Sequence, residues 1–529
     1  MKMIIHKIES RLPRRIEVSH LAIPAILLAM LLAGTARGQG NLTAGDLRRS
    51  GTIQFDITSQ PSTEDEFKTA VALLHSFFYD EARRRFTMIA EQDPGCAMAW
   101  WGVAMTWFHP LWAPPNVEER AAGLAAILKA REIGGKTDLE RDFIEAVHAY
   151  YTATETPAFE KNALAGCSCC GPQAHSARAR AFLESMQGMH KKFPEHVEVA
   201  TFYALAKLGT VDPADKTFAK QKIAGALLEK LFENNPDHPG IAHYLIHAYD
   251  YPELAQGALT AARRYDDIAP WVPHALHMPT HIYTRLGMWQ ESIDGNIASS
   301  NAARDYADRY YEGGSTMDDL HAMDYLMFAY QQTAQDSKAA KLLSHLESIE
   351  HIVPGNEFAS AYAVAAMPAR DCLERRAWKE AADLTLPHAE FVSSFPFAVA
   401  HVEFARAVGA ARSGQPKLAA RAIESLEKLR DSVGESKFLW WMNQIEIQHL
   451  AAAGWLEHCQ HNHAEAETLL RKAATIEDAA GTHPVTPGQI LPAREQLGEM
   501  LLETGHLKAA LVEFERSLQS FPRRLHSHE

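Results

Sequence analysis

The sequence repeats a helical pattern with a period of about 34 residues, a length typical of helix-pair repeats. Pro236 and Pro270 lie one period apart, and each stands twelve positions after a small residue, Ala224 or Ala258. From Glu64 onward, apolar residues recur at intervals of three and four, and turns coincide with Pro and Gly. Because the sequence lacks convincing alternating strand patterns, we expect an all-α fold built from repeated pairs of helices.

The C-terminal copy of the pattern carries most of its features, namely Leu497, Gly498, Leu501, Gly505, Ala510, Phe514 and Pro522. These residues resemble the tetratricopeptide repeat (TPR), a pair of antiparallel helices. The resemblance implies an α-solenoid, a right-handed superhelix whose first helices line a concave groove. Segments around HYLIHAYD, PHALHMPTHIYTRLGMW and LHAMDYLMFAY are also similar to a group of large exported bacterial TPR-like proteins.

The N-terminal segment 1–38 has the features of a secretory signal peptide. Basic residues precede the apolar run Leu21–Gly34, and Ala36 and Gly38 are small residues suited to cleavage before Gln39. The run is too short for a comfortable membrane span, and no other stretch of the sequence is apolar enough to be one. We therefore expect an exported protein, periplasmic or extracellular, with no membrane span in the mature chain.

The charge balance restricts the partners that this protein can have. The chain carries 52 Lys and Arg against 66 Asp and Glu, a formal net charge of −14. The segment 1–38 holds six Lys or Arg and two Glu, a net charge of +4, so its removal would change the total to −18. An acidic chain disfavours nucleic acid and anionic membranes as partners. A protein or peptide partner and a small-molecule ligand are both compatible with the expected groove.

The repeat pattern also suggests how the chain is organised. Its period is irregular in 115–180 and 350–400, where we expect insertions or irregular helix pairs. The predicted parts are a signal peptide (1–38), an extended lead-in (39–64), N-terminal helical repeats (65–215), histidine-rich central repeats (216–348) and C-terminal TPR repeats (349–529).

Histidines in the central repeats recur with the same period. His277 follows His243 by one full period, and His281 follows His247 by the same interval. Relative to the aromatic residue of each first helix, such as Tyr283, polar side chains stand nine, six and two positions earlier. At 100° per residue these offsets cover about 60° of one helix face. The metal site that we predict on this face consists of His243, His247, His274, His277, His281, His321, Asp250 and Asp324.

Neutral imidazoles beside a carboxylate suit zinc, copper or iron, whereas calcium and magnesium prefer oxygen ligands. Six histidines exceed the three or four that one ion needs. Either two ions bind, or some histidines support the ligands or act as bases. A solvent-accessible metal could activate water or bind dioxygen, so the pattern leaves enzymatic activity undecided. The alternatives are a metal-free TPR scaffold that grips a peptide or protein in the same groove, and histidines that are purely structural.

Five further residues are candidates for lining the groove or contacting a partner: Tyr249, Tyr283, Arg285, His109 and Trp112. His109 and Trp112 lie in the aromatic segment WFHPLWAPP, for which a structural role is favoured. Arg285 suits either an anionic ligand or an ordinary ion pair between helices.

Two other clusters are less informative. Cys167, Cys169 and Cys170 are crowded into AGCSCCGP. In an oxidising compartment a disulfide within this loop is favoured over a thiolate metal site, because no second cysteine pair lies nearby in the sequence. The segment from His458 to His463 has the composition of a solvated turn between helices.

Overall fold

The structure is a computed structural model that describes residues 49–111, 114–155, 176–212, 215–354, 358–435, 439–481, 483 and 486–529. These residues belong to one compact unit, Thr43–Glu529. The predicted signal peptide (1–38), the start of the lead-in, Trp112 and the cysteines at 167, 169 and 170 lie outside the described residues.

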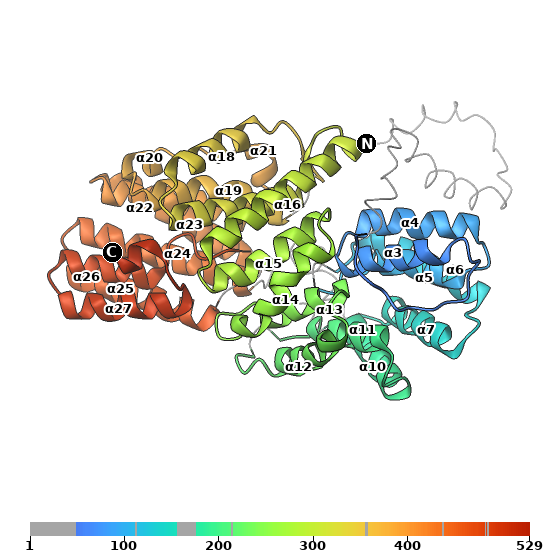
Figure 1. The fold of residues 1–529 in the computed structure, drawn as a ribbon. Coiled ribbons are helices and arrows are strands. Elements are labelled where there is room, and N and C mark those ends of the chain that lie inside the picture. The colour runs from blue at the N-terminus through green and yellow to red at the C-terminus, as the bar shows by residue number, and fades with distance from the viewer. Residues whose placement is uncertain are drawn as a thin grey trace, which may run out of the picture. The chain divides into compact units, whose positions relative to one another are not determined.

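The described part of the chain is almost entirely helical (Figure 1). Its first helix begins at Glu64, where the helical pattern of the sequence begins. The helices of the N-terminal half are α3 (Glu64–His75), α4 (Tyr79–Gln92), α5 (Ala97–Met105), α6 (Val117–Ile133), α7 (Asp138–Thr152), α10 (Ala177–Lys192), α11 (Val197–Leu208), α12 (Ala219–Asn234), α13 (Pro239–Tyr249) and α14 (Ala255–Ile268).

The remaining helices continue to the C-terminus. They are α15 (Pro273–Arg285), α16 (Trp289–Tyr310), α17 (Met317–Gln332), α18 (Asp336–Ser348), α19 (Phe358–Glu374), α20 (Trp378–Ala382), α21 (Ala389–Val392), α22 (Pro396–Arg412), α23 (Pro416–Glu435), α24 (Leu439–Cys459), α25 (His463–Ala480), α26 (Ala493–Glu503), α27 (Leu507–Ser520) and α28 (Leu525–His528). Two short strands, β1 (Ser315–Thr316) and β2 (Ile352–Val353), pair in parallel, with Ser315 opposite Ile352. No described helix has both the length and the apolar character that crossing a membrane requires.

Consecutive helices pack against one another in chain order. Helix α13 contacts α14, α14 contacts α15, and α15 contacts α16 (Figure 1). The first helices of two successive pairs, α13 and α15, begin at Pro239 and Pro273, which are one repeat period apart. The described chain is therefore an all-α solenoid of TPR-like helix pairs, which confirms the fold expected from the repeat pattern.

Small residues let the helices of neighbouring pairs approach closely. Ala224 of α12 and Ala258 of α14 are fully buried. A Cβ atom added at Gly225 of α12 would lie 2.4 Å from the ring of Tyr249, and one added at Gly257 of α14 would lie 2.9 Å from the same ring. The ring of Tyr249 thus fills the space between α12 and α14.

The apolar core consists of two clusters of buried side chains, one between Ile53 and Tyr283 and the other between Ile293 and Ala510. The first cluster includes part of the predicted lead-in. Phe55 is fully buried, and its ring centroid lies 4.9 Å from that of Phe143. This lead-in segment therefore packs on the repeats through one apolar side chain, although its overall composition is polar.

Candidate metal centre

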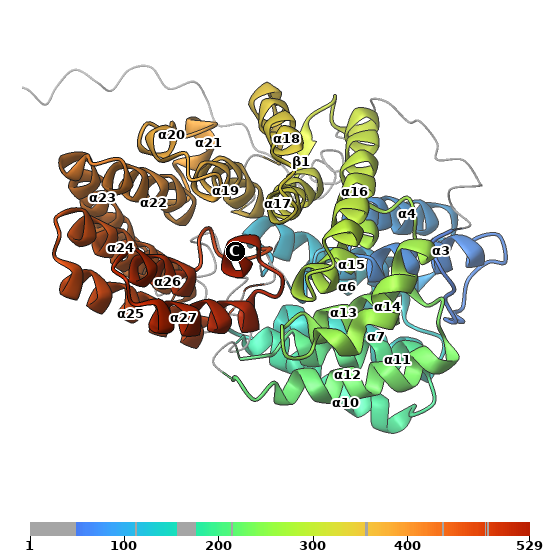
Figure 2. The same ribbon diagram turned by 60° about the vertical axis from the view of Figure 1, so that its left-hand side comes forward.

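The six predicted histidines gather into two groups of three, carried by three first helices of successive pairs. The first trio is His243 and His247 of α13 with His274 of α15, and the second trio is His277 and His281 of α15 with His321 of α17. Within each trio the candidate ligand nitrogens lie within 4.8 Å of one another. Figure 2 shows α13, α15 and α17 as neighbours, consistent with the contacts between them.

Helix α15 contributes to both trios because its histidines are spaced for one face. His274, His277 and His281 stand at positions i, i+3 and i+7, which share a face of an α-helix. Helix α16 packs closely against α15 at Gly295, where an added Cβ atom would meet a side chain of α15 at 2.6 Å. This close approach brings the side chain of Asn296, the next residue, into contact with His277.

In the second trio, hydrogen bonds fix the tautomers of His277 and His281. The amide nitrogen of Asn296 donates to the carbonyl of Ser292, so its oxygen is left to accept from His277 Nδ1, 2.7 Å away. His281 Nδ1 lies 2.8 Å from Asp250 Oδ2. Burial raises the pKa of Asp250, but Arg285, which donates to the other oxygen, opposes this rise and favours the carboxylate form. Both Nδ1 atoms therefore carry the proton, and both Nε2 atoms carry lone pairs.

Those two lone pairs face each other. His277 Nε2 and His281 Nε2 are only 2.9 Å apart. Two nitrogens bound to one tetrahedral zinc ion, with bonds of about 2.0–2.1 Å, would be separated by roughly 3.3 Å. The third member, His321, has its ring centroid 4.4 Å from that of His277, and its buried Nε2 makes no hydrogen bond to any described residue. The second trio thus offers three nitrogens around one point.

The first trio contains a similar close pair of nitrogens. His243 Nδ1 donates to the backbone carbonyl of His75 over 2.6 Å, which leaves its Nε2 with a lone pair, 3.2 Å from His274 Nε2. Gly240 permits this contact, because a Cβ atom there would lie 2.5 Å from the His75 ring. The buried Nε2 of His247 has no hydrogen-bond partner in the described part of the chain.

Burial holds the histidines of both trios in the neutral form that metal ligation needs. It lowers the pKa of His277 to about 4 and that of the other five to well below the ordinary value of 6.5. For these five, neighbouring imidazoles lower the pKa further, because each would repel a second positive charge.

The histidine face is covered rather than open, which differs from the expected solvent-lined groove. Apart from the half-buried His247, the side chains of the trios are at most 4% exposed. Phe77, just after α3, lies over the first trio, with its ring centroid 4.5 Å from that of His243. Tyr325 packs on the second trio, and its hydroxyl donates to the carbonyl of Thr486 over 3.2 Å. Phe77, from near the start of the described chain, and Tyr325, from α17, therefore cover the face.

The predicted carboxylates lie beside the trios rather than within them. Asp250 accepts hydrogen bonds from His281 and Arg285, so it orients a histidine instead of joining the nitrogen ligands. Asp324 forms a fully buried ion pair with Arg370 and belongs to neither trio. Arg285 also donates to the carbonyls of the segment around Thr486, so its role is that of an ion pair between helices.

The predicted groove residues are placed away from the ligand nitrogens. Tyr249 and Tyr283 are 8% and 6% exposed and belong to the apolar core of the helix pairs. The ring of His109 packs at a tilt against that of Tyr79, with centroids 4.5 Å apart, and its Nε2 lies 3.2 Å from the carbonyl of Thr106. The structural role favoured for His109 agrees with these contacts.

A third polar cluster was not predicted from the sequence. Glu198 of α11 bridges His75 and His238, with 2.8 Å between each imidazole Nε2 and a carboxylate oxygen. Although burial alone would raise it, the two histidines lower the pKa of Glu198 far below its usual range. The remaining nitrogens are also satisfied, by the Tyr244 hydroxyl and by the backbone N–H of Ile241. These three side chains are also close enough together to hold an ion, but each of their polar atoms already has a partner, so the contacts favour a role in fastening the helices.

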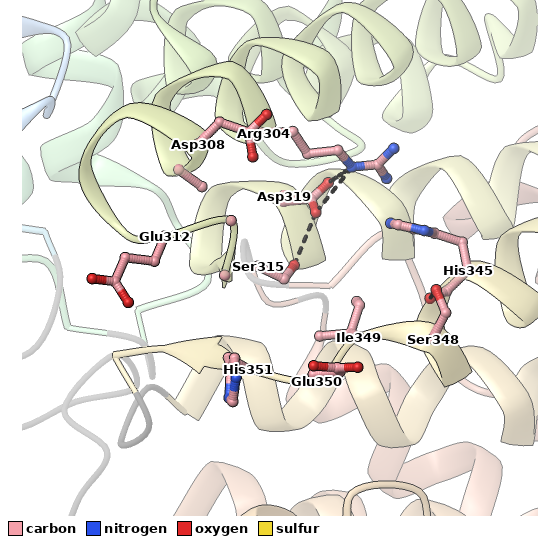
Figure 3. Close-up of a pocket in the computed structure, with 13 residues that line it drawn as sticks. Arg304, Asp308, Glu312, Ser315, Asp319, His345, Ser348, Ile349, Glu350 and His351 are labelled. Carbon is pink, nitrogen blue, oxygen red and sulfur yellow. Dashed lines mark hydrogen bonds and ion pairs between the residues drawn. The ribbon is translucent and has the colours of Figure 1, made fainter. Parts of the chain in front are cut away.

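A surface cavity of about 370 Å³ lies near the first trio but does not include it (Figure 3). Its central carboxylate, Asp319, accepts from Ser315 and Arg304 and is therefore satisfied. The preceding residue, Asp318, has Oδ1 4.0 Å from His274 Nδ1. Burial, together with the nearby carboxylates of Asp80 and Asp319, raises the pKa of Asp318 to about 7.

Comparisons with known proteins add little beyond the fold. No family model matches the sequence, and no curated protein does. Among solved structures, the human IFIT1 dimer with m7Gppp-AAAA is 12% identical over 90% of this chain and 98% of that one, with a TM-score of 0.37. The TPR domain of P58(IPK) is 11% identical over 86% and 99%, with a TM-score of 0.18. At these scores the fold class rests on the chain's own helices.

Proposed function

We propose that this TPR-like protein binds a transition metal through the histidines of α13, α15 and α17. The contact between His277 and His281 carries the proposal. Both Nδ1 protons are committed to Asn296 and Asp250, so the two Nε2 lone pairs, 2.9 Å apart, repel unless a cation lies between them. A shared proton would bury a positive charge held by two nitrogens, whereas a metal ion would be bonded to a third, that of His321.

The donor set indicates the class of metal and of ligand. Neutral imidazoles favour zinc, copper or iron over calcium and magnesium. Three protein nitrogens leave one coordination position for water or a small molecule, as in catalytic metal sites. Water in such a position becomes more acidic, so the centre suits hydrolysis, and with copper or iron it suits oxidation. These properties favour a small ligand at this face over a macromolecule.

The competing function is a metal-free scaffold that grips a peptide on the same face. That function needs histidine side chains that face solvent. His243, His274 and His277 are at most 4% exposed, and Phe77 and Tyr325 pack over the two trios. Peptide binding on the histidine face is therefore the less supported of the two, although a helical repeat scaffold has other surfaces for a protein partner.

Elemental analysis tests the metal proposal. The mature chain, purified without a histidine tag, should contain near-stoichiometric zinc, copper or iron, and a His277→Ala, His281→Ala double variant should lose the metal of that trio. His401→Ala is the matched control, because His401 is also buried with an Nε2 that lacks a partner among the described residues, yet it belongs to neither trio. A metal-free wild-type chain that cannot be reloaded with any of the three metals would refute the proposal. A partner whose binding survives chelators would then favour the scaffold.

Export is a separate proposal, supported by the basic start, the apolar run and the small residues of 1–38. Sequencing the N-terminus of protein recovered from outside the cytoplasm should give Gln39 as the first residue. A chain that stays in the cytoplasm with Met1 intact would contradict export and would leave the metal proposal standing.

A further inference from the structure

We infer that the six histidines form two separate ion sites, one in each trio, and that the site of the second trio binds its ion more tightly. The inference rests on the proposed metal binding and extends it to the number, position and ranking of the ions. It resolves the choice between two ions and one ion with supporting histidines, which spacing in the sequence leaves open.

The two trios share two features that suit a metal site. Each contains a close pair of Nε2 atoms, 3.2 Å apart for His243 and His274 and 2.9 Å apart for His277 and His281. Each also contains one buried Nε2 without a hydrogen-bond partner among the described residues, from His247 or His321. A histidine that only supports a ligand would bond to the nitrogen of that ligand that faces away from the metal, as Asp250 and Asn296 bond to the Nδ1 atoms of His281 and His277. No such contact joins one trio to the other among the hydrogen bonds of the described residues.

The trios are also distinct in space. They have no member in common, and each ligand group is compact by itself. The separation lies in the ligand atoms and not in the rings, because the ring centroids of His274 and His277, 6.4 Å apart, are hardly farther from each other than those of His247 and His274 within the first trio, at 6.3 Å. Each trio therefore offers three nitrogens to one ion, which is the number of protein ligands in an open zinc or copper site.

The supporting contacts differ in kind between the two sites. In the second trio, His281 is oriented by the carboxylate of Asp250 and His277 by the amide of Asn296. In the first trio, His243 is oriented by a neutral backbone carbonyl, and His247 is only half-buried. The carboxylate of Asp318 lies 4.0 Å from His274 Nδ1, which is beyond hydrogen-bond distance. A carboxylate behind an imidazole makes it a more basic ligand, and partners of this kind change metal affinity by about 10- to 100-fold. The second site should therefore fill first, and the first site should exchange its ion more readily.

Zinc titration of the chelator-stripped, untagged mature chain tests the inference. We expect two ions per chain, bound in two steps that differ in affinity by about 10- to 100-fold. His247→Ala should remove the weaker step only, and His321→Ala the tighter step only. Asn296→Ala should weaken the tighter step by about 10- to 100-fold and leave the weaker step unchanged. His463→Ala belongs in every variant, so that the exposed pair His458 and His463, whose Nδ1 atoms lie 3.1 Å apart, adds no zinc to the count.

The outcomes separate this inference from the proposed function. No bound zinc, copper or iron would refute both. One ion that is lost in either trio variant would leave metal binding intact and overturn the two-site inference. Two ions that both survive in His247→Ala and His321→Ala would overturn the assignment to the trios. Circular dichroism checks that each variant folds, and His321→Asn and His247→Asn replace any alanine variant that does not.

Discussion

At the scale of single residues, the hydrogen-bond partners decide what each buried histidine does. His75 and His247 are both imidazoles in the same region, yet both nitrogens of His75 are bonded, to Glu198 and Tyr244. The Nε2 of His247 has no such partner in the described residues. A buried nitrogen without a partner costs free energy, so His247 suits a ligand role whereas His75 suits a structural one.

The neutral histidines predict that the metal-free protein loses stability in mild acid. The pKa of His277 is about 4 in the folded chain and 6.5 in the unfolded chain, so between these values the unfolded chain binds more protons. The stability that this difference contributes is complete above pH 6.5 and is lost as the pH falls toward 4. For His277 alone the loss is about 3 kcal/mol, and the other five histidines shift in the same direction.

Urea unfolding of the chelator-stripped chain at pH 7, 6 and 5 measures this loss. The unfolding free energy should fall steeply across the series, and it should fall less steeply in a His277→Asn variant. An unfolding free energy that is constant from pH 7 to pH 5 would contradict the buried, neutral state of the trios.

At the scale of elements, glycines set how closely the helices approach and so where the ligands lie. Gly240 lets α13 pack on the His75 ring at the end of α3, and Gly295 lets α16 pack on α15. These approaches place the carbonyl of His75 and the amide of Asn296 against the imidazoles of His243 and His277. The orientation of the ligands therefore depends on residues that have no side chain themselves.

Two glycines offer a matched test of this packing. In Gly225→Ala the new methyl group would lie 2.4 Å from the ring of Tyr249, so the helix pair must separate, and overpacking of this kind costs about 1–3 kcal/mol. In Gly188→Ala of α10 the methyl group meets no atom within 4 Å, and the better helix former should stabilise by about 0.5–1 kcal/mol. Thermal and urea unfolding compare the two variants. Equal effects would contradict the packing argument.

At the scale of the whole described chain, residues that are far apart in the sequence make contacts around the histidine face. An ideal repeat array has contacts only between neighbouring repeats. Here Arg285 of α15 donates to the carbonyl of Pro487, far along the chain, and Arg370 of α19 donates to the carbonyl of Gly488. Tyr325 of α17 reaches the carbonyl of Thr486. The segment between α25 and α26 therefore ties the central repeats to the C-terminal ones.

Variants of the ion pair between Arg370 and Asp324 test how much these contacts between distant segments stabilise the chain. Both side chains are fully buried, so Arg370→Met leaves Asp324 without its partner and the carbonyl of Gly488 without its donor. The unfolding free energy should fall by about 3–5 kcal/mol. In the double variant Arg370→Met, Asp324→Leu, most of that loss should be recovered, because no unpaired charge remains. A double variant as unstable as the single one, measured by urea unfolding, would contradict this account.

The sequence alone determined the local features of this protein. The repeat period and the spacing of apolar residues predicted the all-α helix pairs, which the structure confirms from α13 to α16. The same period identified the helix face shared by His243, His277 and their neighbours. Periodicity carries this information because helix geometry depends only on residues a few positions apart.

The tertiary structure decided everything that depends on contacts between distant residues. It divided the histidines into two trios, covered them, assigned Asp250 to His281 and paired Asp324 with Arg370. The acceptor that orients His243 is the carbonyl of His75, in a helix near the start of the described chain. No spacing within one helix encodes such a partner, because it is brought into contact only when the helix pairs stack and their small residues set the distance between them.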